Sequence, residues 1–207
     1  SEMCIRDRHE AFPPTVATFD VERGALTYIS PIPWQTDTAI GKDSWGYRKD
    51  NTYKSTRQII TDLIDIVSKN GMLLLNIGPK PDGTITDEET QVLKELGEWM
   101  KLNGEGIYGT TFWKQFGEGD VNNEEGFFKD REEKAFTEKD FRFTYKRGSI
   151  YAFQMRPNGE NAVIKSLKKH NPHDFIIKRI TLLSTSAALK FERNDNELII
   201  KANENFN

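Results

Sequence analysis

Residues 33–55 read PWQTDTAIGKDSWGYRKDNTYKS, and residues 71–85 read GMLLLNIGPKPDGTI. A helix-forming pattern separates the two stretches. The order of strand-end loop, helix, buried strand and loop is the repeating unit of a β/α barrel. The loops carry indole rings, a carboxylate and glycines, which together suit a sugar-binding site. The sequence therefore predicts a β/α unit with a carbohydrate site in its loops.

The length and composition of the chain limit what this unit can belong to. A complete (β/α)8 barrel needs roughly 250 residues, so a chain of 207 residues predicts only a partial barrel. The 29 basic and 32 acidic residues give a net charge of -3. Such a weak field does not favour nucleic acid or anionic lipid as a partner. No apolar run approaches the roughly 20 residues of a membrane-spanning helix.

The cysteine and histidine residues give little support to a disulfide or a metal site. Cys4 is the single cysteine of the chain, so no internal disulfide can form. His170 and His173 are spaced as zinc ligands can be, but no third ligand accompanies them, and a solvated loop is the favoured interpretation. Residues 1–8, SEMCIRDR, do not lead into the pattern that follows. We expect them to be an artefactual leader.

The first half of the chain predicts loops followed by a helix. Residues 9–50 are rich in prolines, which interrupt helices: Pro13, Pro14, Pro31 and Pro33. Ser55 then suits the N-cap of a helix, and Gly71 suits its C′ position. An apolar stripe is expected to face the core: Ile59, Ile60, Leu63, Ile64 and Val67. Charged residues are expected to face solvent: Asp62, Asp65 and Lys69.

A strand and a second helix are expected next. The apolar run at residues 72–77 is typical of a strand buried on both faces. Asn76 lies near its C-terminal end, where barrel strands carry chemistry; the alternative is that it only caps the loop. The next helix is expected to begin with a capping box of Thr86 at the N-cap and Glu89 at N3. Trp99 lies on the apolar stripe of this helix, which favours packing in the core over ligand contact.

The second half of the chain predicts antiparallel strands. FRFTYKRGSIYAFQM predicts a hairpin around residues 146–148. NAVIKSL and DFIIKRITLLS predict further strands, and ALKFERNDNELIIKA predicts a second hairpin around Asn194 and Asp195. Such short strands imply a β-sandwich. The expected fold class is therefore α/β plus all-β. Residues 9–112 would form the C-terminal part of a (β/α)8-type barrel, and residues 113–207 an antiparallel β-sandwich.

Carboxylates in the first segment are candidates for glycosidase chemistry. A glycosidase uses two carboxyl groups, one of which donates a proton to the leaving oxygen. Glu22 is the best candidate for this donor, because it lies in a proline-bounded loop ahead of the first helix with Asp20 and Arg23 beside it. Asp37 and Asp43 lie in the same region. The alternative for each of them is an ordinary solvated side chain.

Aromatic residues in the same loops are candidates for sugar contact. Trp34, Trp45 and Tyr47 cluster there, and aromatic rings cover the apolar faces of sugars at a low entropic cost. Packing of the loops onto the barrel is the alternative. The two interpretations are balanced for Trp45, whereas packing is favoured for Trp34.

Five stretches in one order make a specific resemblance: DVERG, PWQTDTAIGKDSWGY, DIVSKNGMLLLNIGPKPDGTI, LGEWMKLNGEGIYGT and KAFTEKDFRFTYKRGSIYAF. From about residue 18 onward the chain resembles the second half of a bacterial α-L-fucosidase of glycoside hydrolase family 29. The resemblance implies a (β/α)8-like catalytic barrel followed by a C-terminal β-sandwich. It further implies hydrolysis of terminal α-linked L-fucose with retention, on a fucosylated oligosaccharide or glycoconjugate, with no metal or organic cofactor.

The resemblance also assigns roles to residues. Glu22 in VERG falls where the family places its general acid/base, and Trp45 in DSWGY falls where an aromatic ring covers the fucose methyl group. Trp34 is retained as a second candidate for substrate contact. Gln35 stands where relatives often carry Glu, so we do not expect it to be catalytic. The nucleophilic aspartate and the fucose-binding histidines of the family precede the matched region, so we expect the chain to be a fragment that is inactive alone.

Two other classes of function remain open from the sequence. Residues 113–207 could be a non-catalytic carbohydrate-binding module with the helical part as a docking segment. Phe141, Phe143 and Tyr145 share one face of a strand and would support it if exposed, although a core role is favoured. A purely structural interaction domain is the third possibility. The family resemblance alone favours a periplasmic or secreted location, and the oligomeric state stays open.

Overall fold

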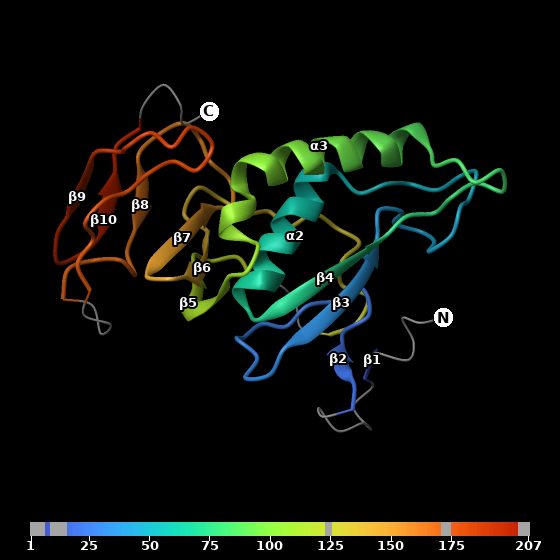
Figure 1. Ribbon diagram of the computed structural model, residues 1–207, viewed down its shortest axis with the longest axis horizontal. Coiled ribbons are helices and arrows are strands. Elements are labelled where there is room, and N and C mark those ends of the chain that lie inside the picture. Colours follow the sequence, from blue (N-terminus) through green and yellow to red (C-terminus); the bar gives the residue numbers. More distant parts are fainter. Residues whose placement is uncertain (1–6, 9–15, 123–125, 171–174, 203–207) are drawn as a thin grey trace.

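The computed structural model describes residues 7–8, 16–122, 126–170 and 175–202 (Figure 1). The fold is mixed α/β, with one parallel sheet and two antiparallel sheets. The parallel sheet has the order β1-β2-β3-β4. Its strands are β1 (Asp7–Arg8), β2 (Thr18–Asp20), β3 (Trp34–Ala39) and β4 (Gly71–Asn76). No described helix is long and apolar enough to cross a membrane.

The described part of residues 9–50 is largely irregular, as expected, but it contains the strands β2 and β3, which were not predicted. All six residues of β3 pair in parallel with β4, from Trp34 opposite Gly71 to Ala39 opposite Asn76. Trp34, Thr36 and Thr38 alternate with less buried neighbours along the strand. The alternation uses threonines rather than large apolar residues, which is why a search for apolar residues does not find it. Asp7–Arg8 pairs with β2, whereas residues 1–6, including Cys4, lie outside the described part of the chain; the leader stays a prediction.

Helix α2 (Thr56–Ser68) connects β3 to β4, and its ends follow local rules. The prediction of Ser55 as the N-cap is confirmed, because its side chain accepts a hydrogen bond from the Gln58 amide. The prediction of Gly71 at C′ is wrong. Asn70 takes the left-handed conformation there, with φ of 71°, which asparagine tolerates better than most residues. Gly71 instead begins β4, where an added Cβ would lie 2.6 Å from the Trp34 indole ring.

The expectation that Asp62, Asp65 and Lys69 face solvent is also wrong for two of the three, Asp65 in α2 and Lys69 at its C-cap. Helix α2 lies between the parallel sheet and strands β5 and β6, so both of its sides are covered (Figure 1). Asp65 is 1% exposed and Lys69 is fully buried. The sheet that covers them comes from the second half of the chain, so neighbouring residues in the sequence give no sign of it.

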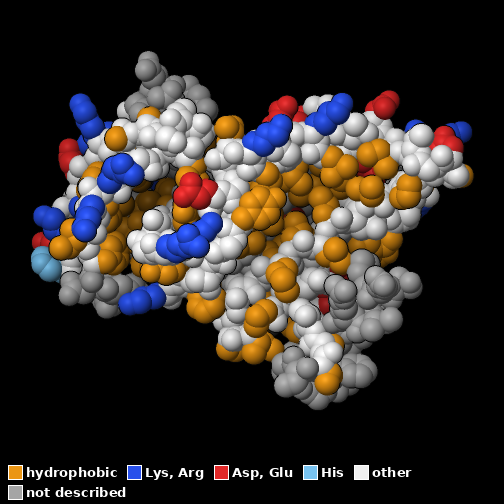
Figure 2. Space-filling model, in the orientation of Figure 1, with side chains coloured by type: hydrophobic (Ala, Val, Ile, Leu, Met, Phe, Trp, Pro, Cys, Tyr) orange, Lys and Arg blue, Asp and Glu red, His pale blue; other side chains and the backbone are white. Residues whose placement is uncertain are grey.

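Strand β4 is covered on one face only, which corrects the expectation of a doubly buried strand. Leu73 and Leu75 pack against the helices, whereas the alternate residue Met72 is 48% exposed. Among the described strands, β4 pairs with β3 alone and is therefore an edge of the sheet. Figure 2 shows hydrophobic side chains gathered below α3 (Asp87–Asn103), over α2 and β4.

Helix α3 confirms the predicted start and the packing of Trp99. Thr86 is the N-cap, and its hydroxyl accepts a hydrogen bond from the Glu89 amide at 3.2 Å. The buried Glu89 carboxylate accepts a hydrogen bond from the Gly78 amide at 2.9 Å, so it also holds the loop after β4. Trp99 packs against the cluster that contains Ile64 and Phe153. A short 3₁₀ helix, η1 (Gly104–Gly106), ends this unit.

The second half forms two three-stranded antiparallel sheets with the orders β5-β6-β7 and β8-β10-β9. The strands are β5 (Thr111–Glu118), β6 (Phe141–Lys146), β7 (Ser149–Gln154), β8 (Ala162–Ile164), β9 (Phe191–Arg193) and β10 (Leu198–Ile200). Both predicted hairpins are confirmed. DFIIKRITLLS is not a strand in its described part, which forms only an isolated bridge from Thr181 to Ala188. Phe141 and Phe143 are buried in a cluster that the two sheets share.

Candidate active site

Glu22 lies two residues after the end of β2, at the carboxyl edge of the parallel sheet. Its main chain is held on both sides of the turn. Val21 donates its amide to the Gln35 carbonyl and Arg23 donates to the Asp37 carbonyl, each at 2.9 Å. The Glu22 side chain is partly buried, and its carboxylate has no hydrogen-bonding partner among the described residues. A half-buried carboxyl group at this edge is available to a ligand.

Trp45 lies at the same edge and contacts the turn that carries Glu22. The Arg23 guanidinium lies over the Trp45 ring, 5.1 Å from its centroid. The Trp45 carbonyl accepts a hydrogen bond from the Asn76 side chain at 2.6 Å, so the end of β4 holds the loop that follows β3. Loops after three neighbouring strands thus meet at one edge, as the carboxyl ends of parallel strands must.

Trp34 lies at the other end of β3 and contacts no part of this edge. Its side chain is fully buried, and its indole nitrogen donates to the Lys69 carbonyl at 3.0 Å. It packs with Val21, Leu26 and Ile66. This geometry favours the packing interpretation for Trp34, and we do not carry it into the proposed sugar site. Tyr47, by contrast, is 38% exposed in the Trp45 loop.

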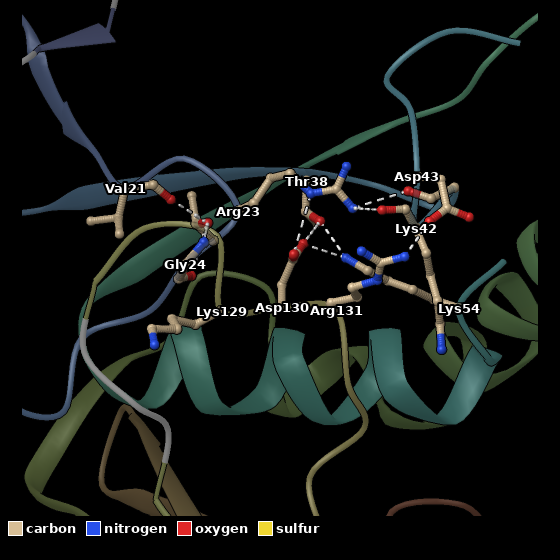
Figure 3. A network of polar contacts seen from close by, with 12 residues as sticks. Val21, Arg23, Gly24, Thr38, Lys42, Asp43, Lys54, Lys129, Asp130 and Arg131 are labelled. Atoms are coloured by element: carbon tan, nitrogen blue, oxygen red, sulfur yellow. Dashed lines mark hydrogen bonds and ion pairs between the residues drawn. The ribbon is translucent and has the colours of Figure 1, made fainter. Parts of the chain in front are cut away.

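A buried charge cluster contains Arg23, the residue that follows Glu22 (Figure 3). We use the name site cluster for Arg23, Thr38, Lys54 and Asp130. The Asp130 carboxylate accepts hydrogen bonds from Thr38 and Lys54, and it pairs with Arg23 at 3.2 Å. Nε of Arg23 makes that contact, and Nη2 donates to the Gly41 and Lys42 carbonyls. Arg23 is therefore held both to Asp130 and to the loop after β3.

The charged groups of this region have distinct electrostatic environments. Burial lowers the pKa of Lys54, and the nearby Asp130 carboxylate opposes that shift. Burial raises the pKa of Asp62 to about 7, with Lys54 acting in the opposite direction. Asp62 lines a small cavity between α2, β3 and the segment that contains Asp130. A pKa in this range means that the protonation of Asp62 is expected to change near neutral pH.

The other carboxylates proposed from the sequence are weaker candidates for a proton donor. Hydrogen bonds from the Thr52 hydroxyl and amide lower the pKa of Asp43, which makes its carboxylic acid form scarce near neutral pH. Asp20 accepts a hydrogen bond from Gln35 at 3.3 Å. One oxygen of Asp37 is buried without a hydrogen-bonding partner among the described residues.

The described residues contain no cluster of three or more histidine, cysteine or acidic side chains that could hold a metal. His170 pairs with Asp195 at 3.0 Å on the surface, and His173 lies outside the described residues. The sequence reasoning missed the role of Asp130. Its segment carries no periodic pattern, and Asp130 is separated from Arg23 by 107 positions. A long-range ion pair of this kind leaves no local signal.

Comparison with known proteins identifies the family of the chain. The fold and the matching sequences place the chain among the glycoside hydrolases. The chain belongs to the α-L-fucosidase family: residues 1–105 of its 207 match the family model described as "Alpha-L-fucosidase". The plasma α-L-fucosidase of Homo sapiens is 39% identical over 90 residues, which are 42% of this chain and 19% of that protein. The tissue α-L-fucosidase of Mus musculus is 40% identical over 84 residues, 39% of this chain and 19% of that protein.

The same family appears among solved structures. The crystal structure of Thermotoga maritima α-fucosidase superposes with a TM-score of 0.73 at 27% identity and covers 97% of this chain. The match takes in 41% of that chain. A second structure of the Thermotoga maritima enzyme is described as a complex with fucose, again with a TM-score of 0.73. The present chain thus spans about a fifth of its curated relatives and about two fifths of the solved ones.

Proposed function

We propose that the chain carries the general acid/base of a retaining α-L-fucosidase, and that Glu22 is this residue. The convergence of three strand-end loops carries the proposal, because it brings the Glu22 turn against Trp45 with Asn76 behind it. In this scheme Glu22 donates a proton to the glycosidic oxygen as the bond to the sugar carbon breaks. It then takes a proton from the water that releases the sugar. Trp45 covers the apolar face of the fucosyl group.

The nucleophile of this reaction would come from outside these 207 residues. A retaining glycosidase needs a second carboxyl group about 5–5.5 Å from the acid/base. We propose that an aspartate on an additional barrel strand supplies it, and that β4 is where the sheet continues. The unpaired edge of β4 and the exposure of Met72 support this arrangement, since long apolar edges are normally covered. Residues 9–112 would then be part of a (β/α)8-type barrel, and residues 113–207 a β-sandwich.

Two boundary observations bear on that division. Strand β5 begins at Thr111, close to the proposed boundary. However, the segment 126–130 returns to the first half, where the Lys129 and Asp130 amides both donate to the Arg23 carbonyl. The connection between β5 and β6, which belongs to the proposed sandwich, would therefore pack against the proposed barrel. We propose a fucosylated oligosaccharide or glycoconjugate as the substrate, in keeping with what the solved Thermotoga maritima enzyme is described as binding.

The test compares leaving groups. In the active enzyme that contains this chain, Glu22→Ala should slow substrates with poor leaving groups by about 10²–10⁴-fold. Activated aryl α-L-fucosides should be much less affected in the bond-breaking step, because they need no proton. Equal losses on both substrates would rule out Glu22 as the acid. The 207-residue chain by itself should show no turnover, and activity that Glu22→Gln abolishes would contradict the proposed origin of the nucleophile.

The carbohydrate-binding module receives no support from a specific observation. Phe141 and Phe143 are at most 2% exposed, so the aromatic face that would bind a glycan is buried in the core. Tyr145, at the end of the same strand, is 36% exposed. We therefore retain the fucosidase as the single proposal.

A further inference from the structure

The segment that contains Asp130 holds the main chain of the Glu22 turn. Phe128 donates its amide to the Glu22 carbonyl at 3.0 Å, and Lys129 donates to the Arg23 carbonyl at 2.8 Å. Gly126 pairs with Ala25 in an isolated antiparallel bridge. A stretch of chain from after β5 is thus hydrogen-bonded to three residues of the turn, Glu22, Arg23 and Ala25.

The turn itself has a conformation that needs such support. Arg23 has φ of 48°, in the left-handed region that costs non-glycine residues free energy. Arg23 is nevertheless buried, at 7% exposed, and its side chain donates three hydrogen bonds, to Asp130, Gly41 and Lys42. Side-chain bonds of Arg23 therefore fix the backbone angle on which the direction of Glu22 depends. Figure 3 shows the Arg23 and Lys54 side chains directed toward the Asp130 carboxylate from different parts of the fold.

Asp130 is the common partner that keeps these groups in place. Lys54 has a fully buried side chain, and the Asp130 side chain is 10% exposed. The Asp130 carbonyl also accepts a hydrogen bond from Gln58 of α2 at 2.8 Å, so α2 fixes the main chain at Asp130. Without the carboxylate, Arg23 would keep only its two carbonyl partners and would be free to leave the Trp45 ring.

We propose that Asp130 is a positioning residue: by holding Arg23, it sets the direction of the Glu22 side chain and the position of the Trp45 ring. The inference rests on the proposed function of Glu22. The inference adds that Asp130, a residue that follows β5, supports the residues at the carboxyl edge of the sheet. In this scheme Asp130 contacts neither the reacting atoms nor the sugar. The second half of the chain is then required for catalytic geometry and not only for stability.

The first experiment needs no activity and uses the 207-residue chain. Indole NMR signals of 15N-labelled protein report each tryptophan, and Trp45→Phe identifies the signal of Trp45. We expect Asp130→Asn to shift the Trp45 signal while those of Trp34 and Trp113 stay in place. Glu133→Gln is the matched control, since it removes one carboxylate from the same segment at an exposed pair with Arg57. An unmoved Trp45 signal in folded Asp130→Asn would overturn the proposal.

The second experiment measures the leaving-group dependence in the active enzyme that contains this chain. Misplacement of a catalytic group by about 1 Å can cost about 100-fold. We therefore expect Asp130→Asn to lower kcat by about 10- to 100-fold on a poor leaving group, with KM nearly unchanged, and to spare an activated aryl fucoside. A structural role alone would reduce both substrates equally, because it lowers only the amount of folded enzyme. Equal loss would therefore reject the positioning role.

Arg23→Lys keeps the experiment decisive if Asp130→Asn does not fold. Lysine keeps the charge but loses the planar fork that reaches three partners, so it should give the same selective loss. If Asp130→Asn does fold, the double variant with Arg23→Lys should lose little more kcat than either single variant, because both changes remove the same contact. Glu22→Gln separates the acid/base role of Glu22 from the positioning role of Asp130. If Glu22→Gln slows both kinds of substrate equally, the proposed function fails. If Glu22→Gln slows only the poor leaving group, but Asp130→Asn and Arg23→Lys slow both equally, only the positioning role fails.

Discussion

Helix α2 has a buried charge cluster at each end, and the two clusters have similar chemistry but different surroundings. In the site cluster, Asp130 lies between Arg23 and Lys54. In the second, which we call the sheet cluster, Asp65 lies between Lys69 at 2.7 Å and Arg142 at 2.5 Å. Each cluster therefore joins one carboxylate to two cations, and each joins the first half of the chain to the second.

The surroundings decide what each cluster can do. All three charged side chains of the sheet cluster are at most 1% exposed, and the ring of Phe116 covers both cations. The site cluster instead reaches the carboxyl edge, where Arg23 contacts Trp45 beside Glu22. A buried ion pair therefore does not mark a site by itself. The site cluster differs because one of its members, Arg23, also contacts Trp45, a residue that we propose to face the ligand.

The largest effect is expected from Asp65→Ala, which should act on stability and not on the site. The change leaves Lys69 and Arg142 buried without their counter-charge, and breaking a buried pair in this way costs about 3–5 kcal/mol. Urea unfolding followed by circular dichroism measures the loss. Replacing Asp65, Lys69 and Arg142 together by apolar residues should recover most of it. A loss below about 1 kcal/mol, or a shift of the Trp45 indole signal in the folded variant, would remove the distinction between the clusters.

The next effect concerns Asp62, which lies on α2 between the two clusters. Burial raises its pKa to about 7 in the folded protein, against about 3.9 in an unfolded chain. The folded state therefore binds the extra proton between these values, and its stability falls as the pH rises through that window. At about pH 8, Asp62→Asn should stabilise the protein by about 1–3 kcal/mol, while near pH 4 it should change little.

Urea midpoints of both proteins across this pH range test the expectation. Asp43→Asn is the control, because the pKa of Asp43 is lowered by its hydrogen bonds with Thr52 and its linkage has the opposite sign. That carboxylate contributes stability above its unfolded pKa, and the contribution is lost as the pH falls through the folded pKa. Parallel curves for the wild type and Asp62→Asn would mean that Asp62 is more hydrated than its surroundings indicate.

The parts of this comparison that could be predicted from the sequence are local. Ser55 and Thr86 were predicted as N-caps because capping depends on residues three positions apart, and both hairpins follow from their turn residues. Asp65 and Lys69 were assigned to the solvent because charged residues on an amphipathic helix usually lie there. Arg142, which reverses that assignment, is 77 positions from Asp65. Glu22 and Trp45 could be named in advance from family motifs, whereas Asp130 has no motif.

A smaller loss of stability is expected from a change at the start of α2, where the N-cap hydrogen bond lies next to a contact with the Asp130 segment. Ser55 accepts a hydrogen bond from the Gln58 amide at 3.0 Å, and Gln58 in turn binds the Asp130 carbonyl. Ser55→Ala should lower the free energy of unfolding by about 1 kcal/mol, as loss of an N-cap usually does. Thr86→Ala on α3 is the matched control and should cost a similar amount. If only Ser55→Ala shifts the Trp45 indole signal, the start of α2 belongs to the support of the site.

The smallest effect is expected from the exposed pair of Arg57 and Glu133, which lies on the same helix and tests whether burial is what matters. Their side chains are 44% and 41% exposed, with 3.3 Å between the charged groups. Water screens such a pair, and ordering two long side chains offsets most of the attraction, so it contributes about 0–1 kcal/mol. Glu133→Gln should accordingly leave the urea midpoint almost unchanged, and added salt should remove any difference. A loss comparable with that of Asp65→Ala would mean that charge pairing stabilises α2 regardless of burial, and the contrast between its two clusters would then need another cause.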